Sequence, residues 1–358
     1  MTLRVLVVED SLTVRRHLCD VLASDPEIEV IGEAEDGKTA IRICESRRPD
    51  VVTMDMMLPV MTGLGATEYI MAHCPTPILI VSSSTNRGEV FKTYEALAAG
   101  AVDVLEKPSG SEPEGEWERR FLATVKLVSR VRPITHVRAR IGSLGQTRAP
   151  SQVDRAAGSG GQAGGPKVVA IGASTGGPGA ILDILRRVPE RFPLPILLVL
   201  HINEPFGAAF AEWLDAQTGL RVTYASEGGS VAGTAGRVTM ASPDTHLVVR
   251  DGRFRLTRDP ERHSCRPSVD VLFESLAVEY GPAAVGCLLT GMGRDGAAGL
   301  LRMREAGALT IAQDEATSVV YGMPREAVLL GAVDRVLPLP EIGPFLAGLA
   351  KAGKEPRA

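Results

Sequence analysis

Short apolar runs alternate with amphipathic stretches along most of this chain, and this alternation limits the possible folds more than any other feature. In residues 1–131, a stretch with helical periodicity follows each of five apolar runs: LRVLVV, EVIGEA, DVVTMD, PILIVSS and VDVLEK. Strands that alternate with helices form a parallel sheet with helices on both faces, because right-handed crossovers place the helices there. Residues 1–131 are therefore expected to form five strand–helix units, a (βα)5 fold.

Residues 167–352 repeat this pattern, from the apolar run KVVAIGA onward to ALTIAQD. One segment differs. In HLVVRDGRFRL, the pair Asp251–Gly252 separates two alternating runs, which is typical of a two-residue hairpin turn. We therefore predict a second α/β domain, which is a doubly wound, mostly parallel sheet with an antiparallel hairpin at one edge.

Charge and composition divide the chain further. The counts of Lys and Arg against Asp and Glu are 10 to 21 in residues 1–118, 9 to 1 in residues 119–166, and 20 to 21 in residues 167–358. The basic segment continues into a stretch rich in Gly, Ser and Gln, which is typical of a flexible linker. Because 358 residues suit two domains, we predict domains at 1–131 and 167–352, joined by a flexible basic linker at 132–166. A nucleic-acid contact through this linker is the alternative.

Apolar stretches and cysteines limit the cellular setting. No stretch approaches the ~18 consecutive apolar residues of a membrane span, and acidic residues interrupt the N-terminus where a signal peptide would stay apolar. The five cysteines form no C-x-x-C pair, which argues against both a disulfide framework and a zinc site. They are Cys19, Cys44, Cys74, Cys265 and Cys287. We expect a cytoplasmic protein without membrane insertion.

Chemically active side chains follow the predicted strands of the first domain. They are Glu9, Asp10, Asp55, Ser82 and Lys107. Three carboxylates at one sheet edge repel one another unless a cation lies among them, and oxygen ligands suit Mg²⁺. One carboxylate could then attack a phosphoryl group, while a hydroxyl and an ammonium bind the transferred oxygens. A helix N-cap or a solvated loop charge is the alternative for any single acid, above all for Asp10.

These positions carry a family resemblance. The pair Glu9–Asp10, Asp55 in TMDMMLP, Ser82 in LIVSS and the pair Lys107–Pro108 resemble a response-regulator receiver domain. The resemblance implies a flavodoxin-like fold, Mg²⁺ held by Glu9, Asp10 and Asp55, and phosphorylation of Asp55 by a partner histidine kinase. It also implies that Ser82 and Lys107 bind the phosphoryl group. Val104 departs from the family, since an aromatic residue is common there.

Three strand ends of the second domain carry Ser174 in GASTGG, His201 after PILLVL, and Asp295 in GMGRDG. Parallel strands place their carboxyl ends along one edge, so these distant residues are expected to converge. A serine hydroxyl needs a base, histidine can supply it, and a carboxylate fixes the tautomer of the histidine. Ser174 lies in a G-x-S-x-G turn before a helix, whose N–H groups favour an oxyanion. The Met292 N–H is a second candidate donor.

Other interpretations of these residues stay open. The GASTGG turn could bind a nucleotide phosphate, although it lacks the spacing of both common phosphate-binding motifs. His246 and His263 compete with His201 for the role of base. Asp295 could be only a turn former, and the competing acids are Asp244, Asp270 and Asp314.

Residues 167–338 resemble the catalytic domain of the chemotaxis protein-glutamate methylesterases. The segments that carry the resemblance are IGASTGGP, LVLHINEPF, SPDTHL, RPSVDVLFESLA, LLTGMGRDGAAGLL and QDEATSVVYGMPREA. The resemblance implies a triad of Ser174, His201 and Asp295, with Thr175 and Met292 lining the site. It implies a γ-glutamyl methyl ester on chemoreceptor helices as substrate, methanol as product, and glutamine deamidation as a side activity. Asn203 and Glu204 depart from the family pattern.

Together, the two resemblances predict a serine esterase controlled by phosphorylation, in which the unphosphorylated first domain covers the Ser174 site. We expect a monomer that has Mg²⁺ in the first domain and no cofactor in the second. One alternative is a two-component regulator whose output is binding, for example to nucleic acid, although the second domain shows no basic recognition helix. Another is the same esterase serving receptors of a different sensory array.

Overall fold

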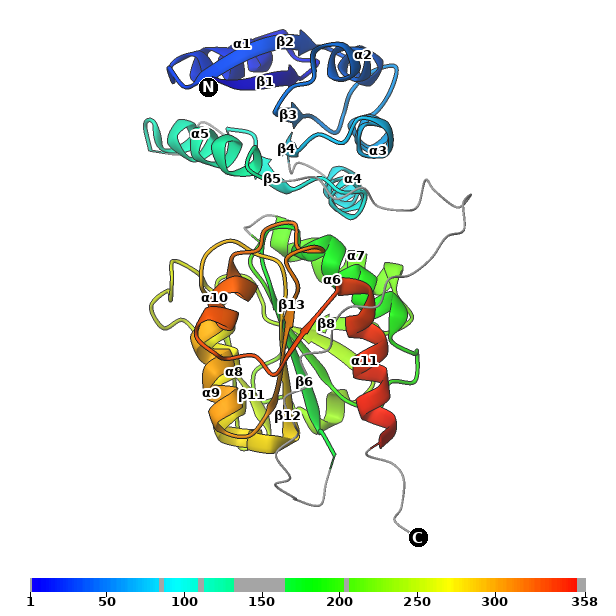
Figure 1. The fold of residues 1–358 in the computed structure, drawn as a ribbon, viewed down its shortest axis with the longest axis vertical. Coiled ribbons are helices and arrows are strands. Elements are labelled where there is room, and N and C mark those ends of the chain that lie inside the picture. The colour runs from blue at the N-terminus through cyan, green and yellow to red at the C-terminus, as the bar shows by residue number, and fades with distance from the viewer. Residues whose placement is uncertain (1, 84–86, 109–112, 132–164, 203–205, 353–358) are drawn as a thin grey trace.

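The computed structural model describes residues 2–83, 87–108, 113–131, 165–202 and 206–352. They form two α/β domains that stack along the long axis of the molecule (Figure 1). Residues 132–164 of the predicted linker lie outside the described residues, as do Asn203 and Glu204. The two domain limits proposed from the sequence therefore stay predictions. Within the described ranges, every helix is too short or too polar to cross a membrane.

The first domain is a five-stranded parallel sheet with the strand order β2-β1-β3-β4-β5. This is the flavodoxin-like order, so the predicted (βα)5 fold is confirmed. The strands are β1 (Leu3–Val8), β2 (Ile28–Ala34), β3 (Val51–Met54), β4 (Ile78–Ser82) and β5 (Asp103–Glu106). The helices are α1 (Leu12–Ala23), α2 (Gly37–Arg47), α3 (Gly63–His73), α4 (Arg87–Ala98) and α5 (Glu116–Val128).

Local sequence signals explain where two of these helices begin. Asp36 accepts hydrogen bonds from the backbone N–H groups of Lys38 and Thr39 at the start of α2, and Thr62 caps α3 in the same way. Alternate residues of β1 point to opposite faces. Val5 and Val7 pack with α1 and α5, whereas Leu6 and Val8 pack with the helices of the other face.

The second domain is a seven-stranded sheet with the order β14-β13-β12-β6-β7-β9-β8, and all its pairs are parallel. The strands are β6 (Val168–Ala173), β7 (Ile196–Leu200), β8 (Arg221–Tyr224), β9 (Arg237–Met240), β12 (Ala284–Leu288), β13 (Leu309–Gln313) and β14 (Arg335–Leu337). Every residue of β6 is buried, as expected for a central parallel strand.

Helices cover both faces of this second sheet (Figure 1). On one face lie α6 (Gly177–Arg187), α7 (Phe206–Gln217) and α11 (Leu339–Ala352), and on the other lie α8 (Val269–Tyr280), α9 (Ala297–Glu305) and α10 (Met323–Leu329). Two short 3₁₀ turns, η2 (Ala232–Thr234) and η3 (Gly281–Ala283), lie in the connections. The prediction of a doubly wound sheet is confirmed.

The predicted hairpin is also confirmed, as β10 (His246–Arg250) and β11 (Arg253–Thr257) around Asp251–Gly252. Both turn residues have positive φ, 52° and 65°, as a type I′ turn requires. The hairpin forms its own two-stranded sheet instead of extending the edge of the main sheet. Helix α8 holds it there, because Glu279 accepts hydrogen bonds from both turn N–H groups.

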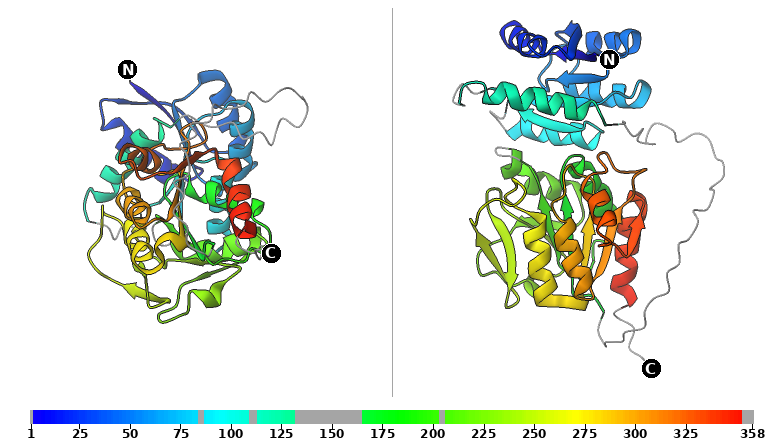
Figure 2. Two further views of the ribbon diagram at one scale, coloured as in Figure 1. Left: turned by 60° about the horizontal axis from the view of Figure 1, so that its bottom comes forward. Right: turned by 60° about the vertical axis from the view of Figure 1, so that its left-hand side comes forward.

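The two domains share a hydrophobic core. Helix α4 packs against α6 and α7, and one continuous cluster of buried side chains runs through both domains. Tyr94 of α4 is fully buried, and its ring centroid lies 5.2 Å from that of Phe210 and 5.3 Å from that of Trp213. Its hydroxyl donates a hydrogen bond to the backbone carbonyl of Phe206. The first domain therefore lies over one end of the second sheet (Figure 2).

Candidate active site

Ser174 and His201 follow directly paired residues on neighbouring parallel strands. Ala173 at the end of β6 pairs with Leu200 at the end of β7, and the His201 N–H donates to the Ala173 carbonyl at 3.0 Å. Since paired strands lie ~4.8 Å apart, the two residues are neighbours at the same sheet edge. On the other side of β6, the loop after β12 brings Asp295 to this edge. The predicted convergence of the three strand ends is confirmed.

Asp295 holds His201 in one orientation. Its carboxylate is 2% exposed, and Oδ2 lies 2.8 Å from His201 Nε2. The other contacts come from the start of α8: the Ser268 hydroxyl donates to Oδ1 at 2.7 Å, the Val269 N–H to Oδ2 at 2.7 Å, and the Asp270 N–H to Oδ1 at 3.2 Å. Because a helix N-terminus favours negative charge, this position suits an ionised carboxylate.

The electrostatics of this pair favour the charged forms of both side chains. Burial would raise the pKa of Asp295, but the hydrogen bond from His201 and those from Ser268 and Val269 lower it below its ordinary value. Burial would lower the pKa of His201, but its contacts with Asp295 and Cys265 raise this pKa to about 9. The histidine is thus stabilised as an imidazolium, as required of a base that takes a proton during a reaction.

Ser174 lies beside this pair without a hydrogen bond to it. In the described part of the chain, no side chain bonds the Ser174 hydroxyl, and His201 Nδ1 instead lies 3.7 Å from Cys265 Sγ. Catalytic hydrogen bonds are often long in the free enzyme and tighten with substrate. Gly291 packs closely against Ser174, since a Cβ at that position would lie 2.7 Å from the Ser174 Cβ. The roles predicted for the three residues stay predictions.

The residues that competed with His201 and Asp295 in the sequence make other contacts. His246 is buried, and its Nδ1 accepts a hydrogen bond from the Ser268 N–H. Asp244 pairs with Arg266 on the surface at 2.5 Å. Asp314 accepts from the Thr317 N–H at 3.0 Å in a turn.

His263 and Asp270 form a second pair next to the first. His263 Nε2 lies 3.2 Å from Asp270 Oδ2, and the Gly299 N–H donates to Asp270 Oδ1 at 2.6 Å. Burial raises the pKa of Asp270 above its usual range. This pair is not in contact with the Ser174 hydroxyl, so it does not replace the pair of His201 and Asp295.

Sequence reasoning missed two residues of this site. Ser268, in the segment RPSVD, has no role of its own in the sequence analysis, yet its hydroxyl donates directly to Asp295. Its signal was available, because a serine before a predicted helix is an N-cap, and here its hydroxyl also accepts from the Val271 N–H at 3.4 Å. Cys265 has no role in the sequence analysis, but it is half-buried and touches His201.

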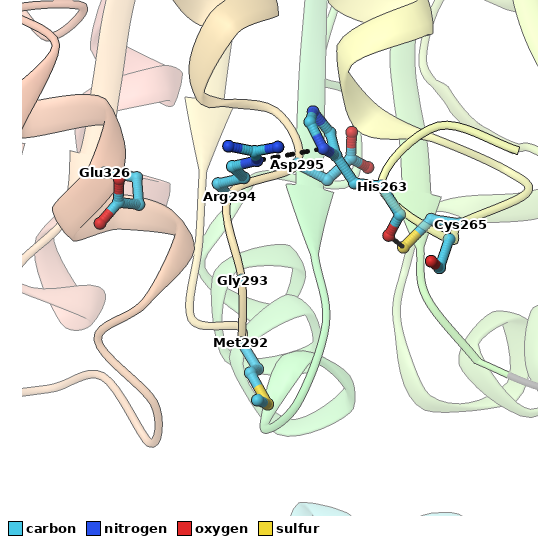
Figure 3. A pocket seen from close by; sticks show the side chains of 8 residues that line it. His263, Cys265, Met292, Gly293, Arg294, Asp295 and Glu326 are labelled. Atoms are coloured by element: carbon cyan, nitrogen blue, oxygen red, sulfur yellow. Dashed lines mark hydrogen bonds between the residues drawn. The ribbon is translucent and has the colours of Figure 1, made fainter.

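An open depression of about 520 Å³ lies next to Asp295, lined by the loops before α8 and α9 and by Glu326 of α10 (Figure 3). Met292 lines this depression and is 53% exposed, while Asp295 lies at its inner end. His263 and Arg294 join across it, since Arg294 Nε donates to His263 Nδ1 at 3.2 Å. The predicted role of the Met292 N–H as an oxyanion donor stays a prediction.

A second cavity, of about 180 Å³, lies between the two domains and includes the Ser174 site. The second domain lines it with Ser174, Thr175 and His201, among others, and the first domain lines it with Asp103, Val104 and Arg120, among others. The Thr175 hydroxyl donates to the Asp103 carboxylate at 3.2 Å across the interface. The first domain therefore forms one wall of the cavity that contains Ser174.

The predicted acidic site of the first domain is assembled at the carboxyl edge of its sheet. Lys107 Nζ lies 2.7 Å from Glu9 Oε2 and 3.0 Å from Asp55 Oδ2, and Ser82 is buried at the end of β4. Burial raises the pKa of Glu9, an effect that its hydrogen bond with Lys107 partly offsets. Burial would lower the pKa of Lys107, but Asp55 and Glu9 raise it.

This site fits a divalent cation. One carboxylate oxygen from each of Glu9, Asp10 and Asp55 can be chosen so that all three lie within 4.8 Å of one another. Three carboxylate ligands leave the other positions of an octahedral Mg²⁺ ion free for water and phosphate oxygens, which is the ligand set that Mg²⁺ prefers. The donor set is therefore consistent with Mg²⁺, with Lys107 neutralising part of the charge.

The chain is similar to known proteins over nearly its full length. Residues 169–346 match the CheB methylesterase family, and residues 5–113 match the response regulator receiver domain family. A protein-glutamate methylesterase/protein-glutamine glutaminase of Anaeromyxobacter dehalogenans is 43% identical over 98% of this chain and 97% of its own length. One from Nitrosospira multiformis is 43% identical over 97% of both chains. The crystal structure of the Thermotoga maritima CheB methylesterase catalytic domain is 36% identical, covers 51% of this chain and 98% of that chain, and has a TM-score of 0.49.

Proposed function

This chain belongs to the CheB methylesterase family, with a response regulator receiver domain in front, and from this we propose that it removes methyl esters from chemoreceptor glutamates. Methanol is the product. By the names of its relatives, it also deamidates glutamine side chains, with ammonia as the product. The observation that carries the proposal is the buried His201–Asp295 pair beside Ser174.

The chemistry follows from the tautomer of His201. Asp295 accepts the Nε2 proton, so Nδ1 is the nitrogen that can take a proton from the Ser174 hydroxyl. The Ser174 oxygen attacks the ester carbonyl. The bond between the carbonyl carbon and the methoxy oxygen then breaks as His201 donates its proton to that oxygen, so that methanol leaves and the acyl-enzyme remains. Water, activated by the same nitrogen, hydrolyses the acyl-enzyme. Backbone N–H groups at the start of α6, which Thr175 precedes, and the Met292 N–H are the proposed oxyanion donors.

The receiver domain controls access to this site in our proposal. Asp55 accepts a phosphoryl group from a histidine kinase, and Ser82 and Lys107 bind the phosphoryl oxygens. Glu9, Asp10 and Asp55 would hold Mg²⁺, which when bound offsets the charge of the phosphoryl group. The unphosphorylated receiver inhibits, because Asp103 and Arg120 form a wall of the cavity that contains Ser174. Phosphorylation favours the separated domains. We propose a monomer that acts in the cytoplasm.

Replacement of the nucleophile tests the reaction. Ser174→Ala in the full chain should lower methanol release from methylated chemoreceptors by about 10⁴-fold or more. Ser226→Ala, at an exposed position of the same domain, is the matched control and should keep the wild-type rate. Retained activity in the Ser174 variant would show that this hydroxyl is not the nucleophile.

Replacement of the phosphoacceptor tests whether phosphorylation of Asp55 regulates the esterase. A small-molecule phosphodonor with Mg²⁺ should raise the esterase rate of the full chain, and Asp55→Asn should remove this increase. Asp20→Asn, at an exposed carboxylate of α1, should still be activated. An Asp55 variant that the phosphodonor activates as strongly as wild type would contradict the assignment.

A further inference from the structure

Cys265 has a contact that the esterase reaction does not explain. It lies in the loop between β11 and α8, and its sulfur is 3.7 Å from His201 Nδ1, the nitrogen assigned as the base. The thiol is half-buried, and the loop around it is unusual, because His263 and Ser264 both have positive φ. Of the other four cysteines, three are buried and Cys19 lies in the receiver. Cys265 is therefore the cysteine whose sulfur, together with His201, could bind one ligand.

The hydrogen bonds of Asp295 prepare His201 to bind a metal ion. Each carboxylate oxygen already accepts two hydrogen bonds, so Asp295 is saturated and does not need a further partner. By holding the proton on Nε2, it leaves Nδ1, which faces Cys265, as the nitrogen that can bind an ion once its own proton has left. Histidines that bind metals commonly donate their other ring N–H to a carboxylate in this way.

The distance between the two ligand atoms suits zinc. Zn–N bonds of ~2.05 Å and Zn–S bonds of ~2.3 Å at a tetrahedral angle place nitrogen and sulfur about 3.6 Å apart. His201 Nδ1 and Cys265 Sγ lie 3.7 Å apart in the structure. Thiolate and imidazole together favour Zn²⁺ over Mg²⁺. Cys265 also lines the open depression of about 520 Å³ (Figure 3), whereas His201 lines the smaller cavity between the domains, so the two ligands lie where these two hollows approach each other.

We propose that His201 Nδ1 and Cys265 Sγ bind Zn²⁺, with water in the remaining positions, and that the bound ion inhibits the esterase. Inhibition follows because the metal occupies the lone pair that would take the proton of Ser174. No pattern in the sequence predicts this site, since its two ligands are 64 residues apart and belong to different loops. Ligands bind a metal in their deprotonated forms, so the affinity for Zn²⁺ should increase with pH. The inhibition rests on the proposed function, whereas the metal site itself does not.

Cobalt spectroscopy tests the site without any use of activity. Co²⁺ is added to the full chain in saturating Mg²⁺, which occupies the receiver carboxylates, and with a phosphine reductant that keeps the thiols reduced. Wild type should show a sulfur-to-cobalt charge-transfer band that Zn²⁺ displaces. Cys265→Ser and His201→Ala should each lose this band. Cys19→Ser, which removes the half-buried thiol of the receiver, is the matched control and should keep it.

Zinc titration of the esterase rate tests the proposed inhibition. Each variant is compared with its own metal-free rate, so a change in basal activity does not affect the result. Cys265→Ser and Cys265→Ala should raise the half-inhibitory Zn²⁺ concentration by about tenfold or more. His263→Ala, which removes the other histidine of the depression, should leave it unchanged. A chelator should restore the wild-type rate.

The outcomes separate the two proposals. The metal-site proposal is wrong if wild type shows no charge-transfer band, or if the band persists in Cys265→Ser. Equal Zn²⁺ sensitivity of wild type and both Cys265 variants overturns the inhibition through this site. If no variant releases methanol while the band behaves as expected, the proposed function fails and the metal site stands.

Discussion

The pH dependence of the esterase follows from the pKa of His201. The raised pKa of about 9 means that only about 1% of the ring is neutral at pH 7, against about three quarters at the ordinary value of 6.5. This shift corresponds to ~3 kcal/mol in favour of the imidazolium. Because the base must be neutral, kcat/KM should rise by about tenfold per pH unit from pH 7 to 9 and then level off.

The same shift has the opposite effect on stability. Because the pKa of His201 is higher in the folded chain than in the unfolded chain, its contribution to stability is full below about pH 6.5. It is lost as the pH rises through about 9. The esterase should therefore gain activity over the same range in which this pair contributes less to folding.

Two measurements check this reasoning. The first is the rate of methanol release by the full chain with phosphodonor, from which the rate of Ser174→Ala is subtracted at each pH. The second is an NMR titration of the histidine rings, with His201 assigned from the spectrum of His201→Gln. Cys265→Ala should lower the pKa of His201, since the thiol contact raises it, and should move the rise in activity to lower pH. A rate that is flat from pH 7 to 9, together with a titration near 6.5, would refute the argument.

Three further predictions concern contacts at the domain interface and around the two sites. Tyr94→Phe removes a hydrogen bond to the Phe206 carbonyl, worth about 1 kcal/mol, and should raise unphosphorylated activity about fivefold; an unchanged basal rate would contradict the closed interface. Ser268→Ala removes a donor from Asp295 and should lower kcat about tenfold with little change in KM, as steady-state kinetics would show. Lys107→Ala removes the cation between two carboxylates and should weaken phosphodonor activation, unless this ammonium plays no part in binding the phosphoryl group.

Both sheets could be predicted from the sequence because apolar runs and helical stretches alternate throughout. The convergence of Ser174 and His201 could also be predicted, since both directly follow parallel strands. The sequence also predicts that the glycine turn GMGRDG approaches the Ser174 site, but not that Gly291 is the residue that packs against Ser174. Close approach of two backbones is a tertiary property that glycine permits without specifying its partner.

The remaining features depend on loops whose path no periodicity reveals. Cys265 lies in a polar loop with two positive φ angles, so nothing in its neighbourhood predicts contact with His201. The hairpin could be predicted, but its separation from the main sheet depends on Glu279 of α8. The ring orientation of His201 depends on where the start of α8 places Asp295, which is a result of packing between distant segments.

The wall that Asp103 and Arg120 form over the Ser174 cavity has a thermodynamic consequence for signalling. Substrate and receiver compete for one surface, and such coupling is reciprocal for binding free energies. If phosphorylation makes the Ser174 cavity easier for a receptor to enter, an engaged receptor must in turn shift the phosphorylation equilibrium of the receiver toward the phosphorylated form by the same factor. The number of methylated receptors in an array would then influence how much of the esterase is phosphorylated.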